Sequence, residues 1–246
     1  MTQPILRASF EKAGHFLFRT RNFLFPAAFL AVVALLPPPR DRPHMAAEIT
    51  IGLSLLVAGQ AIRVVTIGFA YIKRGGKGGR IFARGLVTEG VFAHCRNPMY
   101  AGNLLAVFGL LVTAGNPYGL AAGGALFLLA YLSIILAEET YLAGRFGDEY
   151  RRYCARAPRL LPRLRGLLAT LRPLAFDGRK VVSKEHGTLY LNLMLAVGIL
   201  VYGAHRAGDL DRGLPVLAAV AAVGTLGYLV ARIAKKKTTW LKAERA

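Results

Sequence analysis

The chain has 246 residues, of which 54% are hydrophobic, and its formal net charge is +19. Its mean hydropathy of +0.43 is too high for an ordinary soluble domain, and its apolar residues come in blocks long enough to cross a bilayer as helices. A soluble chain this basic would suggest a nucleic-acid-binding protein, but here the basic residues flank the apolar blocks, as at a membrane surface. We therefore expect an all-α integral membrane protein that contacts membrane lipids and binds no nucleic acid.

The N-terminal part is expected to approach the membrane along its surface. Residues 1–22 are basic and weakly amphipathic, which favours an interfacial segment. Residues 23–36 are apolar but short and contain Pro26, so we expect a first span here, with a re-entrant segment as the alternative. Residues 47–72 form a clear second span with one charge, Arg63. That arginine either snorkels to the nearby surface or faces the bundle as an anion ligand.

A glycine-rich basic stretch follows the second span. Residues 73–97 are expected to form a loop, because glycines alternate with lysines and arginines at its start. These glycines invite comparison with phosphate-binding loops. However, no Ser or Thr follows the lysine at the required spacing, and no strand–loop–helix unit surrounds it. A flexible basic loop is the favoured interpretation.

An abrupt polar-to-apolar boundary ends this loop at His94-Cys95-Arg96-Asn97-Pro98. Proline suits the first turn of a helix because its missing N–H would be unpaired there, so Asn97 is predicted to be the cap and Pro98 the first helical residue. The remaining N–H groups of that turn could bind an anion. The alternative is a capped helix start with no ligand.

Two spans separated by a tight turn come next. Residues 98–114 and 120–137 are the predicted third and fourth spans, and Asn116-Pro117-Tyr118-Gly119 predicts the turn between them. So short a connection makes these two helices an antiparallel hairpin. The hairpin returns the chain to the side of the membrane that it left.

Adjacent carboxylates, Glu138 and Glu139, mark the end of the fourth span. The hairpin should bring them level with Arg96 and Asn97. Neighbouring residues on a helix point about 100° apart, so one glutamate would face the bundle and the other would face water. The inward glutamate could bind a cationic ligand or act as a base, whereas the alternative is a solvated helix end.

The C-terminal half contains two further spans, at residues 188–204 and 214–234. Before them, a polar helix with an aromatic face is expected near 141–153, and a basic amphipathic helix on the membrane surface within 163–187. Six spans place both termini in the cytoplasm. This topology puts 27 lysines and arginines inside and four outside (Arg40, Arg42, Arg206 and Arg212), in agreement with the positive-inside rule.

Three motifs occur in order: Arg96-Asn97-Pro98-Met99-Tyr100-x-Gly102, then Glu138-Glu139, then Phe146-Gly147-x-Glu149-Tyr150-x-x-Tyr153. In this order and setting they resemble the integral membrane methyltransferases, a superfamily that contains isoprenylcysteine carboxyl methyltransferases and phosphatidylethanolamine N-methyltransferases. The segment from Arg63 to Gly90 is also similar, so the resemblance covers roughly residues 60–162. The usual family histidine is Asn97 here, although the phosphatidylethanolamine enzymes also carry Asn-Pro-Met-Tyr.

The resemblance implies a cytoplasmic pocket for S-adenosylmethionine, which leaves as S-adenosylhomocysteine, and a lipophilic acceptor that enters from the bilayer. The pocket would be formed by loops, helix ends and a C-terminal-side amphipathic helix. No metal is expected, since Cys95 and Cys154 lack the spacing of a zinc site. The cofactor-binding residues implied are Leu86, Val87, His94, Arg96, Asn97, Pro98, Tyr100, Gly102, Asn103, Glu138, Glu139, Tyr150 and Tyr153.

The residues do not choose the acceptor. An amine acceptor must lose a proton, and Glu138 or Glu139 would be the base. A carboxylate acceptor needs a cation to hold it, and Arg63 or Arg159 could serve. Alternatives to methyl transfer are a membrane reductase of the steroid-reductase type that uses NADPH, and a non-catalytic membrane protein.

The expected organisation has four parts. Residues 1–59 hold the interfacial segment and first spans, 60–162 the methyltransferase core with the hairpin 98–137, 163–187 the basic interfacial helix, and 188–246 two additional spans and a basic tail. The two additional spans either cap the substrate entrance or mediate association. The oligomeric state is left open, and the expected location is a bacterial inner membrane.

Overall fold

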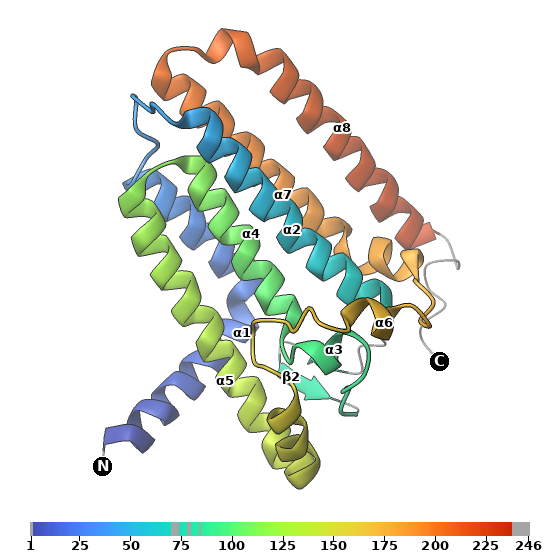
Figure 1. The fold of residues 1–246 in the computed structure, drawn as a ribbon. Coiled ribbons are helices and arrows are strands. Elements are labelled where there is room, and N and C mark those ends of the chain that lie inside the picture. Colours follow the sequence, from blue (N-terminus) through green and yellow to red (C-terminus); the bar gives the residue numbers. More distant parts are fainter. Residues whose placement is uncertain (1, 70–73, 78–79, 84, 238–246) are drawn as a thin grey trace.

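A bundle of six long helices with two short helices and one two-stranded hairpin makes up the described part of the computed structural model, residues 2–69, 74–77, 80–83 and 85–237 (Figure 1). The end of the predicted second span, Lys73 and Gly78-Gly79 lie outside these residues. The long helices are α1 (Thr2–Leu35), α2 (Met45–Phe69), α4 (Pro98–Ala114), α5 (Pro117–Arg156), α7 (Gly178–Ala207) and α8 (Leu210–Lys237). The short elements are β1 (Arg74–Lys77), β2 (Arg80–Ala83), α3 (Val91–His94) and α6 (Leu167–Leu171).

Five of the described helices, α1, α2, α5, α7 and α8, are long and apolar enough to cross a membrane. α4 is apolar but shorter, with 17 residues, which is near the lower limit for a span of about 17–25 residues. The chain is therefore an all-α integral membrane protein, as its sequence indicates. The predicted interfacial segment 1–22 and the first span are one continuous helix, α1, which bends between its two ends (Figure 1).

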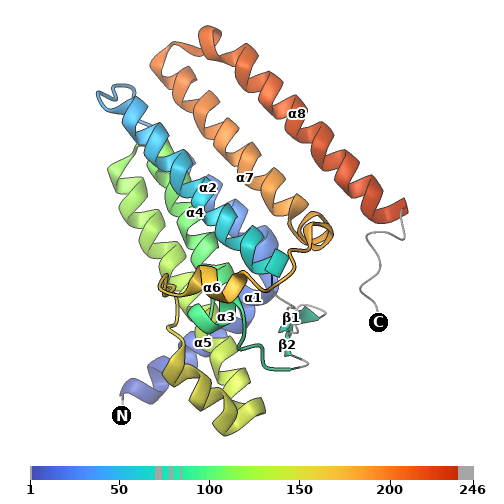
Figure 2. The ribbon, with the colours of Figure 1, turned by 45° about the vertical axis from the view of Figure 1, so that its right-hand side comes forward.

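Paired glycines allow α2 and α4 to pack closely, and these helices lie side by side in both views (Figure 2). A Cβ added to Gly59 would lie 2.5 Å from the carbonyl oxygen of Gly102, and one added to Gly109 would lie 2.5 Å from that of Gly52. The two pairs are seven residues apart on each helix, so they fall on one face. Only glycine fits at these four positions, and the axes of α2 and α4 approach closely as a result.

The turn between α4 and α5 has the predicted residues in the predicted roles. Gly115 ends α4 in the left-handed conformation (φ 71°), and its N–H donates to the carbonyls of Leu111 and Val112. Asn116 then caps α5, because its Oδ1 accepts hydrogen bonds from the N–H groups of Tyr118 and Gly119. The antiparallel hairpin is confirmed.

α5 does not end at Glu138 and Glu139, as the sequence suggested. The helix is 40 residues long and continues to Arg156, and its only non-helical backbone is at Gly147 (φ 50°). The helix continues because no proline or glycine interrupts it near the glutamates. Both carboxylates therefore lie within a helix and are buried, so the alternative interpretation, a solvated helix end, is wrong.

Two segments predicted as simple stretches have more complex structures. The loop 73–97 contains an antiparallel hairpin in which Gly75 pairs with Phe82 and Gly76 with Ile81, followed by α3. The predicted amphipathic helix within 163–187 is instead an extended segment with α6, only five residues long, and the start of α7. The leucines of this segment are largely exposed, except Leu171, which is buried.

α7 and α8 form a second helical hairpin at the edge of the bundle (Figure 2). Their contact includes stacked rings of Tyr190 and Tyr228, with centroids 4.4 Å apart. α7 also packs against α2 and α4, whereas α8 lies on the outer side of α7. The predicted last two spans are thus present, and α7 is the one that touches the core of the bundle.

Candidate functional site

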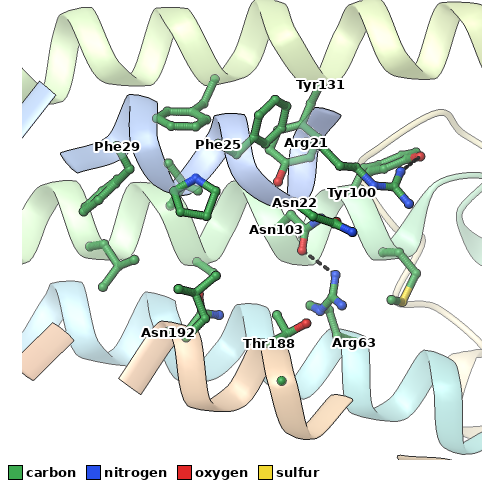
Figure 3. A pocket seen from close by; sticks show the side chains of 18 of the residues that line it. Arg21, Asn22, Phe25, Phe29, Arg63, Tyr100, Asn103, Tyr131, Thr188 and Asn192 are labelled. Carbon is green, nitrogen blue, oxygen red and sulfur yellow. Dashed lines mark hydrogen bonds between the residues drawn. The ribbon is translucent and has the colours of Figure 1, made fainter. Parts of the chain in front are cut away.

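A cavity of about 640 Å³ lies among α1, α2, α4, α5 and α7. Most of the polar lining residues lie toward one end of the cavity, near Tyr100 and Asn103 at the start of α4 (Figure 3). They include Arg21, Asn22, Arg63, Asn97, Tyr100, Asn103, Glu138, Lys184, Thr188 and Asn192. The lining further along the same helices is apolar, with Phe25, Phe29, Val107, Leu110, Phe127, Leu191 and Leu195. A molecule with a polar group and a hydrocarbon tail suits such a cavity.

A chain of hydrogen bonds joins α1, α4 and α5 at the polar end. Tyr100 Oη donates to Glu138 Oε1 at 3.0 Å, and Arg21 Nη1 donates to Tyr100 Oη at 3.1 Å. Glu138 is 8% exposed, so a solvated position for this side chain is excluded. The carboxylate lines the cavity, and its Oε1 accepts the hydrogen bond of the Tyr100 hydroxyl.

Arg63 is buried and faces the bundle, so it does not snorkel to the surface. Its Nε donates to Glu185 Oε2 at 2.9 Å and its Nη2 to Glu185 Oε1 at 2.5 Å. Its Nη1 also donates to Asn103 Oδ1, the bond drawn in Figure 3. Glu185 neutralises Arg63 by this bidentate contact. The loss of either partner would leave a buried charge, at a cost of about 3–5 kcal/mol.

A second group of charges, here called the charged cluster, consists of Arg96, Glu139 and Arg159. Glu139 Oε1 lies 3.2 Å from Arg96 Nη1, and Glu139 Oε2 accepts from Arg159 Nη2 at 2.8 Å. Burial has the largest single effect and lowers the pKa of Arg96, but Glu139, Cys154 and Tyr150 together raise it, and the pKa lies above its ordinary value. The two neighbouring glutamates thus face different groups, Glu138 the cavity and Glu139 the charged cluster. The expectation that one of them faces water is wrong.

Asn97 connects the cavity and the charged cluster. It precedes Pro98 at the start of α4, as predicted, but its side chain does not cap the helix. Its Nδ2 instead donates to the carbonyl of Arg159 at 3.1 Å, and the N–H of Arg96 donates to the carbonyl of Pro158 at 2.8 Å. These bonds fix the segment after α5 against the start of α4. Pro98 and Asn97 both line the cavity.

Several residues that the resemblance singled out lie outside the cavity lining. His94 bonds the carbonyl of Arg163 at 2.8 Å and Thr170 Oγ1 at 2.9 Å, so both ring nitrogens hold the 163–170 segment. Tyr153 donates to the carbonyl of Phe92 at 2.8 Å. The others form packing contacts: Gly102 packs on α2, and Leu86 and Tyr150 belong to the apolar group around Tyr153. Val87, between Leu86 and α3, is half-buried.

Sequence reasoning thus identified six cavity residues (Arg63, Asn97, Pro98, Tyr100, Asn103 and Glu138) and missed the contributions of α1 and α7. Arg21-Asn22 stands immediately before the first apolar run, and Glu185-His186 immediately before the fifth. A polar pair at the start of a span is the sequence signal that could have indicated the contributions of α1 and α7. Among the described residues, no group of three or more His, Cys, Asp or Glu could hold a metal ion.

Comparison with known proteins matches the part of the chain that supplies the α2, α4 and α5 walls of this site. Residues 47–149 match the family model described as phospholipid methyltransferase. A cobalt-zinc-cadmium resistance protein, CzcN, of Cupriavidus metallidurans is 37% identical over 79 residues, which is 32% of this chain and 36% of that protein. No solved structure matches the chain significantly.

Two similar proteins are methyltransferases by name. The protein-S-isoprenylcysteine O-methyltransferase of Schizosaccharomyces pombe is 31% identical over 77 residues, which is 31% of this chain and 33% of that protein. Protein-S-isoprenylcysteine O-methyltransferase B of Arabidopsis thaliana is 32% identical over 114 residues, which is 45% of this chain and 57% of that protein. The chain thus spans less than two thirds of each of these relatives. The segment that supplies Arg63, Asn97, Tyr100 and Glu138 is thus similar to the phospholipid methyltransferase family model and to isoprenylcysteine O-methyltransferases.

Proposed function

We propose that the protein transfers a methyl group from S-adenosylmethionine to a lipophilic acceptor held within the membrane. One observation carries this proposal: residues of the family segment, together with polar residues of α1 and α7, form the polar end of a cavity whose other end is apolar. Asn97, Tyr100 and Glu138 line that end. An acceptor with its reacting group there would keep its hydrocarbon part among Phe29, Leu110 and similar side chains.

The residues at this end fit the charges of the cofactor. S-adenosylmethionine carries an ammonium group, a carboxylate and a sulfonium centre, and the charged cluster offers both a carboxylate and guanidinium groups. We assign Arg96 to the ligand's carboxylate and Glu139 to its ammonium group, with Asn97 between the cofactor and the cavity. When bound, the cofactor would supply an electrophilic methyl group.

The protein's own contribution is to position the acceptor, to exclude water and to accept a proton. Tyr100 and Arg21 orient Glu138 toward the cavity, where it would take a proton from an amine or hydroxyl acceptor. Arg63 is neutralised by Glu185, and Arg159 does not line the cavity. Glu138 is therefore better placed for its predicted role than either arginine is for holding a carboxylate.

We further propose that the cofactor side of the protein is cytoplasmic, in a bacterial inner membrane. Lysine and arginine are concentrated at the end of the bundle that contains α3, α6, the start of α1 and the end of α8 (Figure 1). Such a bias marks the cytoplasmic side.

The test uses detergent-purified protein, a total lipid extract and S-adenosylmethionine labelled in its methyl group. Label released as methanol by mild alkali would mean a methyl ester, whereas alkali-stable label would mean a methyl on nitrogen or carbon, or an ether. Hydride transfer from NADPH, measured in parallel, would instead support a reductase. No label in any lipid would contradict the proposal.

The site assignment has its own test in the binding of S-adenosylhomocysteine. Glu139→Ala and Asn97→Ala should each weaken binding by about tenfold or more, because each removes a hydrogen-bonding group that is buried. Glu89→Ala, at an exposed position in the same half of the chain, is the control. Unchanged binding in both site variants would overturn the assignment.

A further inference from the structure

The seventh helix forms one wall of the cavity although it lies outside the family segment, residues 47–149. Its lining residues Thr188, Leu191, Asn192 and Leu195 recur at helical spacing, so they share one face. In Figure 3, Thr188 of α7 lies beside Arg63, with Asn103 above them. α7 therefore supplies both polar and apolar residues to the cavity lining.

Two polar contacts fix α7 against α2. The carboxylate of Glu185 holds the guanidinium of Arg63, and both side chains are more than nine-tenths buried. Two helical turns further along α7, Asn192 Nδ2 donates to Gln60 Oε1 at 2.9 Å. The two contacts join the same pair of antiparallel helices, so they set both the position and the rotation of α7.

Packing alone does not explain these contacts. A charged pair buried in a membrane protein is costly, and apolar residues of similar size often stabilise a fold as well or better. The pair does place the Arg63 side chain at the polar end of the cavity, with Asn103 as its third partner. A role in the geometry of the site is therefore the better explanation.

We propose that α7 is the acceptor-binding wall of the site and that Glu185 is a positioning residue, which holds Arg63 and thereby the polar end of the cavity. The proposal rests on the proposed methyltransferase function. The acceptor is a lipid with a long apolar chain that lies along Leu191 and Leu195, with its reacting group near Thr188. Because α7 lies outside the family segment, it gives this chain an acceptor preference of its own.

The first test makes the cavity narrower at α7. Leu191→Trp fills the cavity side of α7, and Leu189→Trp is the matched control, because Leu189 has similar exposure (40% against 36%) but does not line the cavity. Leu191→Trp should raise the half-saturating concentration of the lipid extract about tenfold, equivalent to about 1.4 kcal/mol. Half-saturation by S-adenosylmethionine should stay within about twofold.

A photoreactive probe, a long-chain alkyl diazirine, makes the test independent of activity. It should crosslink to the α7 peptide that contains Leu191 and Leu195, less in Leu191→Trp than in Leu189→Trp. If the probe labels α7 but the protein transfers no methyl group, the acceptor-binding wall stands and the proposed methyltransferase function is overturned. The proposal that α7 binds the acceptor would be overturned if methyl transfer and labelling were equal in the two variants, or if the probe never labelled α7.

The second test separates positioning from folding. Arg63→Met and Glu185→Met should each lower the melting temperature, whereas the double variant, with no buried charge left, should recover most of the loss. The double variant, and Glu185→Gln as a variant that keeps the side-chain size, should still require about tenfold more lipid extract for half-saturation. A double variant that melts and transfers like the wild type would show that the pair has no positioning role.

Discussion

Glu138 and Glu139 are adjacent on α5, yet their carboxylates bind groups on different sides of the helix. Glu138 accepts from Tyr100 at 3.0 Å and lines the cavity, whereas Glu139 accepts from Arg159 at 2.8 Å and belongs to the charged cluster. The two positions point about 100° apart because they are consecutive in a helix. One helical step thus separates a side chain suited to the acceptor from one suited to the cofactor.

Neutralising the two glutamates should therefore produce different defects. Glu138→Gln should slow methyl transfer by about 10²–10⁴-fold if the carboxylate acts as a base, with S-adenosylhomocysteine binding retained. Glu139→Gln should mainly weaken that binding. Single-turnover rates and equilibrium binding distinguish the two, with Glu89→Gln as the exposed control. Identical defects in both variants would contradict the division of roles.

Removal of the Arg96 guanidinium should weaken cofactor binding without unfolding the protein. Arg96→Gln deletes a charge 3.2 Å from Glu139, and we expect S-adenosylhomocysteine to bind about tenfold or more weakly. Arg151→Gln deletes a similar but exposed pair with Asp148, and such surface pairs contribute only about 0–1 kcal/mol. Isothermal titration of both variants is the measurement. Equal affinity in the two variants would show that Arg96 does not contact the cofactor.

A methyl group at the contact of α2 and α4 should destabilise the bundle. In Gly102→Ala the new Cβ would lie 2.7 Å from the carbonyl oxygen of Gly59, and we expect a loss of about 1–3 kcal/mol. Gly198→Ala places a methyl on α7 with no atom within 4 Å, and should stabilise the helix by about 0.5–1 kcal/mol. Thermal unfolding in detergent compares the pair. A harmless Gly102→Ala would mean that the two helices are not in close contact.

His94 should act through the segment it holds. In His94→Ala the bonds to the Arg163 carbonyl and to Thr170 are lost, so trypsin should cut faster after Arg163 and Arg165. The exposed His44 provides the control variant, His44→Ala, for which we expect no change. Cleavage rates followed by mass spectrometry measure the effect. Unchanged cleavage in His94→Ala would show that other contacts hold the segment.

The parts of the fold that the sequence predicted well depend on local chemistry. Pro98 begins α4 because its φ is fixed near the helical value, and Asn116 caps α5 because its side chain accepts from N–H groups two and three residues on. The β-hairpin within the 73–97 loop was not predicted, because a glycine-rich stretch carries little side-chain pattern that indicates strands. The leucine spacing in 163–187 indicated one amphipathic helix, but the structure forms only the five-residue α6 and the start of α7 there.

The parts of the site that the sequence missed depend on distant contacts. Arg63 and Glu185 are separated by 122 residues, so nothing near Arg63 identifies its partner. Asn97 was placed correctly at the start of α4, but its side chain bonds Arg159 from beyond α5 instead of capping its own helix. Local capping rules cannot foresee a competing partner that tertiary structure brings in.

The pairing of Arg63 with Glu185 also bears on how this chain can be shortened. A protein that ends before α7 would keep every residue of the matched segment 47–149 but would leave Arg63 in hydrocarbon without its counter-ion. The unit that can be inserted into a membrane and folded is thus larger than the unit that a family comparison recognises. A minimal version of this protein has to retain α7 or lose Arg63 together with it.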